Sequence, residues 1–324
     1  MKKMLITGGA GFIGSHLAER LLAGPEPVEV VCVDNLSTGS LDNLAALRGR
    51  PGFEFVRADV RDASIMAALV ERCDGIFHLA AAVGVQLIVE QPVHTIETNI
   101  HGSEVVLDLA SRFGRSVLLA STSEVYGKST RESFSEDDDV VFGPTRYSRW
   151  CYACSKMVDE FLALAHHQQF GLQVAICRFF NTIGPRQTGR YGMVVPRFVR
   201  AALRGEPITI YGTGRQSRCF CNVSDVVTAM VALIDCPGAA GEVVNVGAEQ
   251  SIAIADLAAT IIERTGSTSP VEYLSYAQAY GRPFDDMLHR RPDLRKIKRL
   301  IGYEPKKTLD QTLDEIIEYE RKRL

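Results

Sequence analysis

Two short stretches of the sequence carry side chains that could act together in acid–base chemistry. Residues 121–127 supply hydroxyls and a carboxylate, and residues 150–156 supply the phenol of Tyr152 and the ammonium of Lys156. If the second stretch is helical, Tyr152 and Lys156 lie one turn apart on one face, where the ammonium lowers the pKa of the phenol. We therefore expect Tyr152 to act as a base near neutral pH.

A base of this kind needs an acceptor for the electrons of the bond that it helps to break. Residues 3–7 form a short apolar run, the glycine-rich residues 8–14 follow, and residues 15–22 have a helical pattern. Such a strand, turn and helix bring backbone N–H groups to a pyrophosphate. A second predicted strand, residues 28–33, ends at Asp34, whose carboxylate would bind an adenosine ribose and repel a 2′-phosphate. The pattern predicts NAD rather than NADP.

The alternation of strands and helices continues along the chain. We expect strands over 53–57, 75–80, 116–120 and 173–179, and helices over 99–113 and 152–169. This order predicts an α/β fold with a doubly wound parallel (Rossmann) sheet. Ligands bind such sheets at the carboxyl ends of the strands, and the residues that follow predicted strand ends are Gly8, Asp34, Ala81, Ser121 and Asn181.

Basic residues gather in the loops after the strand predicted at 173–179. Arg186, Arg190, Arg215 and Arg218 lie there, together with Tyr211. Because arginine binds phosphate and tyrosine can stack on an aromatic ring, we interpret these loops as a pocket for a phosphorylated ligand with an aromatic head. A solvated basic surface is the alternative. Predicted helices over 195–203, 252–265 and 309–322, around an extended segment at 270–273, make residues 181–324 a smaller α+β lobe.

The composition argues against several classes of protein. The chain of 324 residues is 46% hydrophobic and 23% charged, which is typical of soluble globular proteins. Its formal net charge of -3 provides no basic field, so we expect no nucleic acid or membrane partner. No apolar run approaches the roughly 20 residues that span a bilayer. The residues after Met1 are interpreted as the first strand of a cytoplasmic protein rather than a signal peptide.

The eight cysteines are scattered through apolar contexts, which predicts buried free thiols in a reducing compartment. Cys151 and Cys154 form a Cys-x-x-Cys pair, but no second Cys or His pair lies at zinc spacing, so we expect no metal site. The acidic run at 136–139 is interpreted as a solvated loop.

Taken together, the motifs resemble the extended short-chain dehydrogenase/reductase family of nucleotide-sugar epimerases, dehydratases and decarboxylases. The matching positions are 7–14, Asp34 with Asn35, Asp59, 78–81, 121–127, Tyr152 with Lys156, 178–186 and Arg218. The resemblance implies that bound NAD is a transient oxidant and that Tyr152 takes the proton of a sugar 4-hydroxyl, giving a 4-keto sugar. It implies that residues 1–180, with further sheet and helix around 220–250, bind NAD, and that residues 181–324 mainly bind a nucleotide sugar.

Within this family, residues 121–127, 143–152 and 280–292 resemble UDP-glucuronic acid decarboxylases most. Ser123-Glu124 replaces the Asp-Glu pair of 4,6-dehydratases, which argues against elimination of water. The resemblance implies roles for Ser123, Glu124 and Arg290, with Arg290 pairing with the substrate carboxylate or serving in proton delivery to carbon 5. The product that the resemblance implies is UDP-xylose, or UDP-4-keto-pentose if the ketone leaves before reduction. The loop at 187–193 departs from the decarboxylase pattern.

We expect three groups of residues to make the site. The catalytic group is Thr122, Ser123, Glu124, Tyr152, Lys156 and Arg290. The NAD group is Gly8, Gly11, Phe12, Ile13, Asp34, Asn35, Asp59, Val60, Leu79, Ala80, Ala81, Asn99, Tyr152, Lys156 and Phe179. The group for the UDP-sugar is Asn181, Arg186, Val195, Tyr211, Arg218 and Arg290.

Two other functions stay open. A 4-epimerase of UDP-glucose, UDP-glucuronate or their N-acetyl forms would need Tyr152, Lys156, Thr122 and NAD equally, so only Glu124 and Arg290 favour decarboxylation. Arg290 could instead contact the diphosphate, as family arginines in this region do. A non-catalytic NAD-binding protein is the second alternative, and the intact Tyr152 and Lys156 argue against it. The resemblance also implies a homodimer, with helices near 99–113 and 152–169 forming a four-helix interface.

Overall fold

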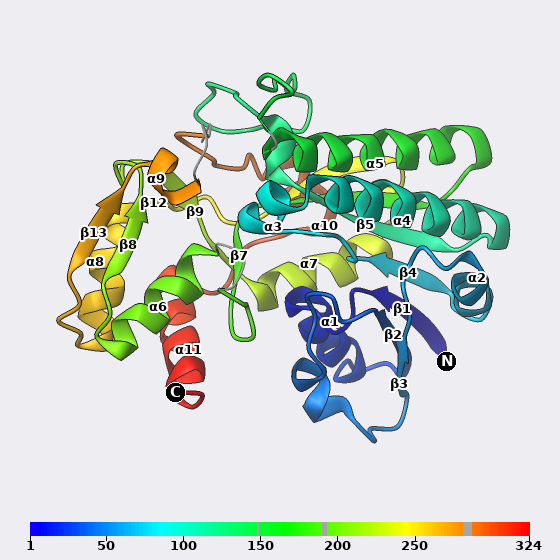
Figure 1. Ribbon diagram of the computed structural model, residues 1–324. Coiled ribbons are helices and arrows are strands. Elements are labelled where there is room, and N and C mark those ends of the chain that lie inside the picture. The colour runs from blue at the N-terminus through cyan, green and yellow to red at the C-terminus, as the bar shows by residue number, and fades with distance from the viewer. Residues whose placement is uncertain (148, 190–192, 281–286) are drawn as a thin grey trace.

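The computed structural model describes residues 1–147, 149–189, 193–280 and 287–324 (Figure 1). Ser148, Arg190 and Gly281, which belong to stretches singled out above, lie outside the described residues.

The centre of the molecule is a seven-stranded sheet with the strand order β11-β6-β5-β4-β1-β2-β3. Every neighbouring pair in this sheet is parallel. Its strands are β1 (Lys2–Thr7), β2 (Val28–Asp34), β3 (Phe53–Arg57), β4 (Gly75–His78), β5 (Ser116–Thr122), β6 (Val174–Phe179) and β11 (Glu242–Val246). The order reverses beside β1 and brings the ends of β1, β2, β4, β5 and β6 to one edge. The doubly wound parallel sheet is confirmed.

Helices cover both faces of the sheet, because the central strands are apolar on both faces and must be buried on both. The core around the sheet has two layers, one between the sheet and α1, α7 and α10 and the other between the sheet and α2, α4 and α5. Figure 1 shows α4 and α5 side by side on one face and α1 with α7 on the other. These helices are α1 (Phe12–Leu22), α2 (Ala63–Glu71), α4 (Pro92–Phe113), α5 (Arg149–Phe170), α7 (Val223–Ile234) and α10 (Arg295–Ile301).

A second hydrophobic core, built from residues 183–317, lies beyond the carboxyl ends of the strands. Its helices are α6 (Val194–Arg204), α8 (Ile254–Thr265) and α11 (Leu309–Arg321). Its small sheets pair β8 (Ile208–Tyr211) with β13 (Val271–Leu274) and β9 (Ser217–Cys219) with β12 (Ser251–Ala253). The remaining elements are β7 (Thr182–Ile183), β10 (Cys221–Asn222), α3 (Val85–Glu90), α9 (Tyr276–Tyr280), η1 (Leu41–Leu47), η2 (Ser123–Tyr126) and η3 (Pro237–Ala239).

Three local predictions need correction. The helix expected from residue 99 begins at Pro92, where proline suits the first helical position. The helix expected from residue 252 begins at Ile254, because Ile252 pairs with Arg218 in a strand. Glu136, expected in a solvated loop, is buried and accepts a hydrogen bond of 2.8 Å from the Asn245 N–H.

A buried ion pair joins α5 to β6, the second strand from one edge of the sheet. Arg178 on β6 donates to both carboxylate oxygens of Glu160 on α5, with an Nη2–Oε2 distance of 2.7 Å. The Ser121 hydroxyl at the end of β5 donates to the same carboxylate at 2.5 Å. The guanidinium also lies 4.7 Å from the ring centre of Tyr126. A single pair of charges therefore fixes β5, β6, α5 and η2 relative to one another.

Replacing Arg178 with methionine should lower the free energy of unfolding by roughly 3–5 kcal/mol, because Glu160 would remain buried without its counter-charge. Urea unfolding followed by circular dichroism measures the loss. The matched control is Arg72→Met, which breaks the exposed pair with Glu54 and should cost about 1 kcal/mol or less. Equal losses in the two variants would contradict the importance of the buried pair.

Candidate active site

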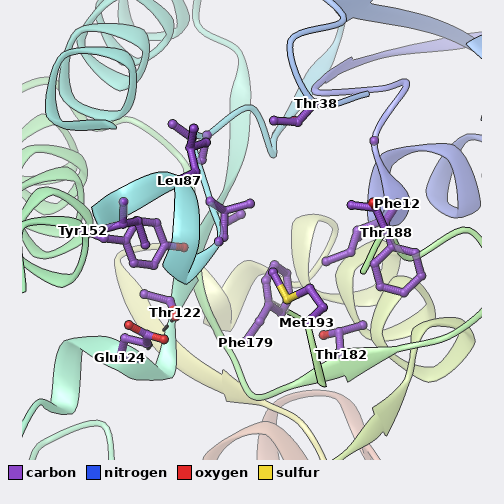
Figure 2. Close-up of a pocket in the computed structure, with 18 of the residues that line it drawn as sticks. Phe12, Thr38, Leu87, Thr122, Glu124, Tyr152, Phe179, Thr182, Thr188 and Met193 are labelled. Carbon is purple, nitrogen blue, oxygen red and sulfur yellow. Dashed lines mark hydrogen bonds between the residues drawn. The ribbon is translucent and has the colours of Figure 1, made fainter. Parts of the chain in front are cut away.

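A cavity of about 600 Å³ lies where the strand ends of the large sheet face the second core. It is lined by the turn after β1, the ends of β2, β4 and β5, the first turns of α5, and residues of α6, β8 and β9. Figure 2 shows Tyr152, Thr122 and Glu124 on one wall, Phe12 and Thr188 on the opposite wall, and Phe179, Thr182 and Met193 between them.

The glycine turn leaves room for a ligand beside backbone N–H groups. Gly8 has φ +69, and a Cβ there would lie 2.9 Å from the Ala80 nitrogen. A Cβ on Gly14 would lie 2.3 Å from the Gly8 carbonyl oxygen. No side chain caps the N-terminus of α1, so its first amide groups are left for an anion. The turn therefore fits the diphosphate of a dinucleotide.

The carboxylate after β2 is held in place by the backbone. Asp34 is buried, and its two oxygens accept hydrogen bonds from Ala10 N at 3.0 Å and Leu36 N at 2.7 Å. Burial raises the pKa of Asp34, while these two hydrogen bonds oppose the rise. Each oxygen keeps a second lone pair for a ribose hydroxyl. The position fits the adenosine end of the dinucleotide.

Asn35 and Asp59 continue the same end of the cavity. Asn35 Nδ2 donates to Asp59 Oδ2 at 2.9 Å, and Arg61 binds Asp59 through two further hydrogen bonds. The Arg61 guanidinium holds the pKa of Asp59 well below its usual range. Asp59 therefore stays ionised and keeps the Asn35 amide fixed at the edge of the cavity.

Tyr152 and Thr122 meet at the centre of the site. Tyr152 lies in the first turns of α5, and Figure 2 shows its hydroxyl directed into the cavity near Thr122 at the end of β5. Burial raises the pKa of Tyr152, and the Glu124 carboxylate raises it further. A hydrogen bond from Thr122 and the charge of Arg290 act in the opposite direction. The net shift is upward, opposite to our prediction.

Burial of the phenol is the main cause of the upward shift, and the partner of Lys156 explains why its ammonium does not offset this effect. Its Nζ donates to Asp159 Oδ2 at 2.7 Å, and the two side chains are 3% and 0% exposed. The ammonium is thus neutralised by a carboxylate one turn further along α5, which weakens its effect on the phenol. The prediction that Lys156 lowers the net pKa of Tyr152 is wrong for this structure.

Glu124 and Arg290 form a second pair of opposite charges beside Tyr152. Arg290 Nη1 lies 3.3 Å from Glu124 Oε1, and Arg290 Nη2 donates to Asn181 Oδ1. The neighbouring Ser123 hydroxyl is buried and makes no hydrogen bond with the described residues. This corner of the cavity therefore offers a cation, a carboxyl group and a hydroxyl to a ligand.

The predicted group of loop arginines is only partly assembled. Arg218 and Tyr211 line the cavity, whereas Arg215 is exposed outside it. Arg186 is a correction: it does not line the cavity, because its guanidinium binds Glu19 at 2.7 Å and His16 at 2.7 Å. Arg197 on α6, which the sequence reasoning missed, lines the cavity and stacks 4.2 Å from the ring centre of Tyr211.

Asn99 is the other predicted residue that does not line the cavity. Its Oδ1 accepts a hydrogen bond from Ala82 N at 2.8 Å, and its Nδ2 donates to Ser155 Oγ at 3.0 Å. It therefore joins the turn after β4 to α5 from behind the site. All other predicted site residues line the cavity: Gly8, Gly11, Phe12, Ile13, Asp34, Asn35, Asp59, Val60, Leu79, Ala80, Ala81, Thr122, Ser123, Glu124, Tyr152, Lys156, Phe179, Asn181, Val195, Tyr211, Arg218 and Arg290.

With this geometry established, comparison with known proteins decides the family. The model of the NAD dependent epimerase/dehydratase family matches residues 4–247. The chain belongs to this family. Its cofactor is NAD, the glycine turn and Asp34 fit that dinucleotide, and the protein is an enzyme.

Individual relatives of this epimerase/dehydratase chain include decarboxylases and epimerases. The chain is 41% identical to a UDP-N-acetyl-alpha-D-glucosaminuronate decarboxylase of Bacillus cytotoxicus, over 99% of this chain and 98% of the relative. It is 39% identical to UDP-glucuronic acid decarboxylase 1 of Xenopus tropicalis, over 100% of this chain and 73% of the relative. A solved UDP-glucuronic acid 4-epimerase from Bacillus cereus, in complex with UDP-glucuronic acid and NAD, superposes with TM-score 0.88 and 27% identity, covering 99% of this chain and 100% of that one.

The described residues also show whether the chain has membrane-spanning helices, metal-binding groups or disulfides. Among the described residues, no helix is long and apolar enough to cross a membrane. Over the same ranges, no group of three or more His, Cys, Asp or Glu side chains is placed to hold a metal ion. All eight cysteines are free, as predicted, but the expectation that they are buried is wrong for Cys154, which is exposed, while Cys151 and Cys236 are half-buried.

Replacing Asp34 with asparagine should weaken NAD binding roughly 10- to 100-fold, because hydrogen bonds to a charged acceptor contribute about 1.5–3 kcal/mol. The preference for NAD over NADP should shrink as well, since the repulsive charge is lost. Calorimetric titration with each dinucleotide measures both effects. Asp62→Asn, which changes an exposed helix cap on α2, is the control and should bind NAD normally. Unchanged NAD affinity in the Asp34 variant would exclude the assigned ribose contact.

Proposed function

We propose that the protein is an NAD-dependent decarboxylase of a UDP-hexuronate, with UDP-glucuronate as the first substrate to test. The observation that carries the proposal is the Glu124–Arg290 contact of 3.3 Å beside Tyr152. A guanidinium in this corner can bind the carboxylate that distinguishes a uronate from a neutral sugar. Both curated relatives described above are named as decarboxylases of such sugars.

The residues present can perform the proton transfers that this reaction needs. Tyr152 accepts the proton of the sugar 4-hydroxyl as a phenolate, a form that the positive charge of bound NAD would favour against the effect of burial, with Thr122 hydrogen-bonded to it. NAD bound along the glycine turn supplies the hydride acceptor at carbon 4 and later the hydride donor. The 4-keto sugar is a β-keto acid, so the bond between carbons 5 and 6 breaks to release carbon dioxide, and the electron pair passes to the ketone as an enolate.

Glu124 and Arg290 have complementary tasks in the steps that follow oxidation. Arg290 can pair with the substrate carboxylate, and the Glu124 carboxyl group beside it can deliver a proton to carbon 5 of the enolate. Ser123, whose hydroxyl is buried and lacks a hydrogen-bond partner among the described residues, can bind a sugar hydroxyl beside it.

The remaining residues of the cavity suit the nucleotide. Arg218 is the predicted contact for the diphosphate, and we propose Arg197, which lines the same cavity, as a second contact. Tyr211 is the predicted stacking surface for the base, and Asn181 and Val195 line the same cavity. We assign the nucleotide sugar to the region that the sequence places mainly in residues 181–324, and NAD to residues 1–180 with the returns around 220–250.

We also propose a homodimer in the cytoplasm, with no nucleic acid partner. The outward faces of α4 and α5 carry apolar side chains that are exposed in the single chain, among them Val93 at 66%, Phe161 at 65% and Phe170 at 65%. Adjacent parallel helices with such faces can pack on their copies as a four-helix interface. Light scattering of the purified protein tests the dimer. The free cysteines are consistent with a reducing compartment.

The direct test of the reaction is incubation of the purified protein with UDP-glucuronate and catalytic NAD. We expect carbon dioxide release and a nucleotide sugar lighter by one carbon dioxide, its mass distinguishing UDP-xylose from UDP-4-keto-pentose. Tyr152→Phe should reduce turnover by about 10²- to 10⁴-fold. UDP-galacturonate formed without loss of mass would instead make the protein a 4-epimerase. No conversion would direct the assay to UDP-N-acetylglucosaminuronate, UDP-glucose and UDP-N-acetylglucosamine.

Replacing Arg290 with glutamine should weaken binding of UDP-glucuronate by roughly 10- to 100-fold, because a charge-assisted contact with the carboxylate is lost. UDP-glucose has no carboxylate, so its affinity should change little and serves as the matched control. Calorimetry with the NAD-loaded enzyme measures both ligands. Equal weakening of the two would show that Arg290 contacts the diphosphate instead.

A further inference from the structure

Behind Tyr152, a row of buried polar side chains crosses the molecule from β1 to α5. Its members are Thr7 on β1, His78 on β4, Ser103 on α4, and Asp159 and Lys156 on α5, all of them at most 3% exposed. Thr7 Oγ1 lies 2.8 Å from His78 Nδ1, His78 Nε2 lies 3.3 Å from Ser103 Oγ, and Lys156 Nζ lies 2.7 Å from Asp159 Oδ2. Of these five residues, only Lys156 is among the predicted site residues.

The direction of each hydrogen bond follows from counting donors and acceptors. Thr7 Oγ1 accepts from Leu79 N at 3.1 Å and from Ala80 N at 3.2 Å, so both its lone pairs are used and its hydrogen points to His78 Nδ1. Burial lowers the pKa of His78 to about 3, so the ring is neutral and carries its proton on Nε2. That proton is donated to Ser103, whose own hydrogen is then free.

The last member of the row is the Asp159 carboxylate, which also binds Lys156. Burial raises the pKa of Asp159, while the Lys156 ammonium and, to a smaller extent, the Ser103 hydroxyl oppose the rise. Asp159 Oδ1 is buried and has no hydrogen-bond partner among the described residues, so this oxygen is left to accept the free hydrogen of Ser103. The hydroxyl of Thr7 and the ring N–H of His78 are therefore directed toward Ser103, and the first donors, Leu79 N and Ala80 N, belong to residues that line the NAD end of the cavity.

We propose that Asp159 is a positioning residue that holds the Lys156 ammonium in a buried ion pair and moderates its action on Tyr152, and that the row from Thr7 through His78 and Ser103 keeps this carboxylate charged and oriented. The proposal rests on Tyr152 as the base of the proposed function. Asp159 lies seven residues from Tyr152, or two helical turns and about 10 Å along the axis. The negative charge of Asp159 opposes formation of tyrosinate. Asp159 also restrains the Lys156 ammonium, which is the cation that would favour tyrosinate.

Several other charges act on the same groups and must stay constant in a test. Those acting on Tyr152 besides Asp159 are Glu124 on η2 and Arg290 in the segment before α10. Those acting on Asp159 are Lys156 and Glu160 on α5, and Lys156 also acts on His78. Asp159→Asn changes none of them and keeps the shape of the side chain.

The test is a pH titration of Tyr152 in the NAD-loaded enzyme, read from the ultraviolet absorbance of tyrosinate. Subtracting the same titration of a Tyr152→Phe variant isolates this residue. In the Asp159→Asn background we expect the midpoint to fall by about 1 pH unit, since a charge at about 10 Å is removed and Lys156 is released. The acidic limb of kcat/KM with the substrate should move the same way. An unmoved or higher midpoint would overturn the proposal.

Glu320→Gln is the matched control, because it removes a buried carboxylate from the ion pair with Arg200 on α6, away from the cavity. It should leave the Tyr152 midpoint unchanged. A shift of the same size there would show a general loss of stability and not a positioning role. The titration needs no turnover, so a shifted midpoint without conversion of UDP-glucuronate would reject the proposed reaction and retain the role of Asp159.

A second measurement applies if the Asp159 variant does not fold. Histidine-selective ¹⁵N labelling of the unaltered protein, with His78→Gln to assign the signal among the seven histidines, reports the tautomer of His78 directly. We expect a neutral ring protonated on Nε2 that does not titrate between about pH 5 and 8, the range in which an ordinary histidine changes charge. A ring protonated on Nδ1, or one that titrates in this range, would break the row and overturn the proposal.

Discussion

The ion pair between Arg178 and Glu160 is the contact on which the geometry of the site depends. Removing two charges from water is costly, and such a pair persists only where its remaining lone pairs and N–H groups are satisfied. Here Ser121, the Glu136 carbonyl oxygen and the ring of Tyr126 complete the shell. Because these partners come from different elements, the shell can form only when β5, β6, α5 and η2 have their native arrangement. That arrangement is also what places Thr122 opposite Tyr152.

Three pairs of opposite charge lie between this core and the cavity. The pair at the cavity is the longest and the most exposed. The Nη2–Oε2 distance of Arg178–Glu160 and the Nζ–Oδ2 distance of Lys156–Asp159 are both 2.7 Å, with all four side chains at most 7% exposed. The Glu124–Arg290 contact is 3.3 Å, with side chains 15% and 11% exposed. The first two pairs hold the scaffold and the lysine. The third pair is longer and more exposed to solvent. An incoming carboxylate can therefore separate it at the smallest cost in free energy.

The sequence predicted the features that depend on neighbouring residues. The strands, the glycine turn and Asp34 follow from local pattern, and the family and fold expected from them are confirmed. Arg186 was misplaced because its partners on α1 lie about 170 residues away and only the tertiary fold brings them together. Arg197 was missed because an arginine on an amphipathic helix is typical of a solvated face. Asp159, by contrast, stands three residues after Lys156, and that spacing could have predicted the pair.

The order of the strands has a consequence for how the protein is made. Strand β6 pairs on one side with β5, and its other edge is covered only by β11, which comes after 62 intervening residues that include α6, β8 and α7. A nascent chain that has reached the end of β6 therefore leaves the ribosome with an apolar strand edge unpaired, and such edges recruit other chains. Translation must continue through much of the second core before the large sheet can close. The two halves of this enzyme are consequently made as one unit, and a gene cut after β6 would encode an aggregation-prone fragment.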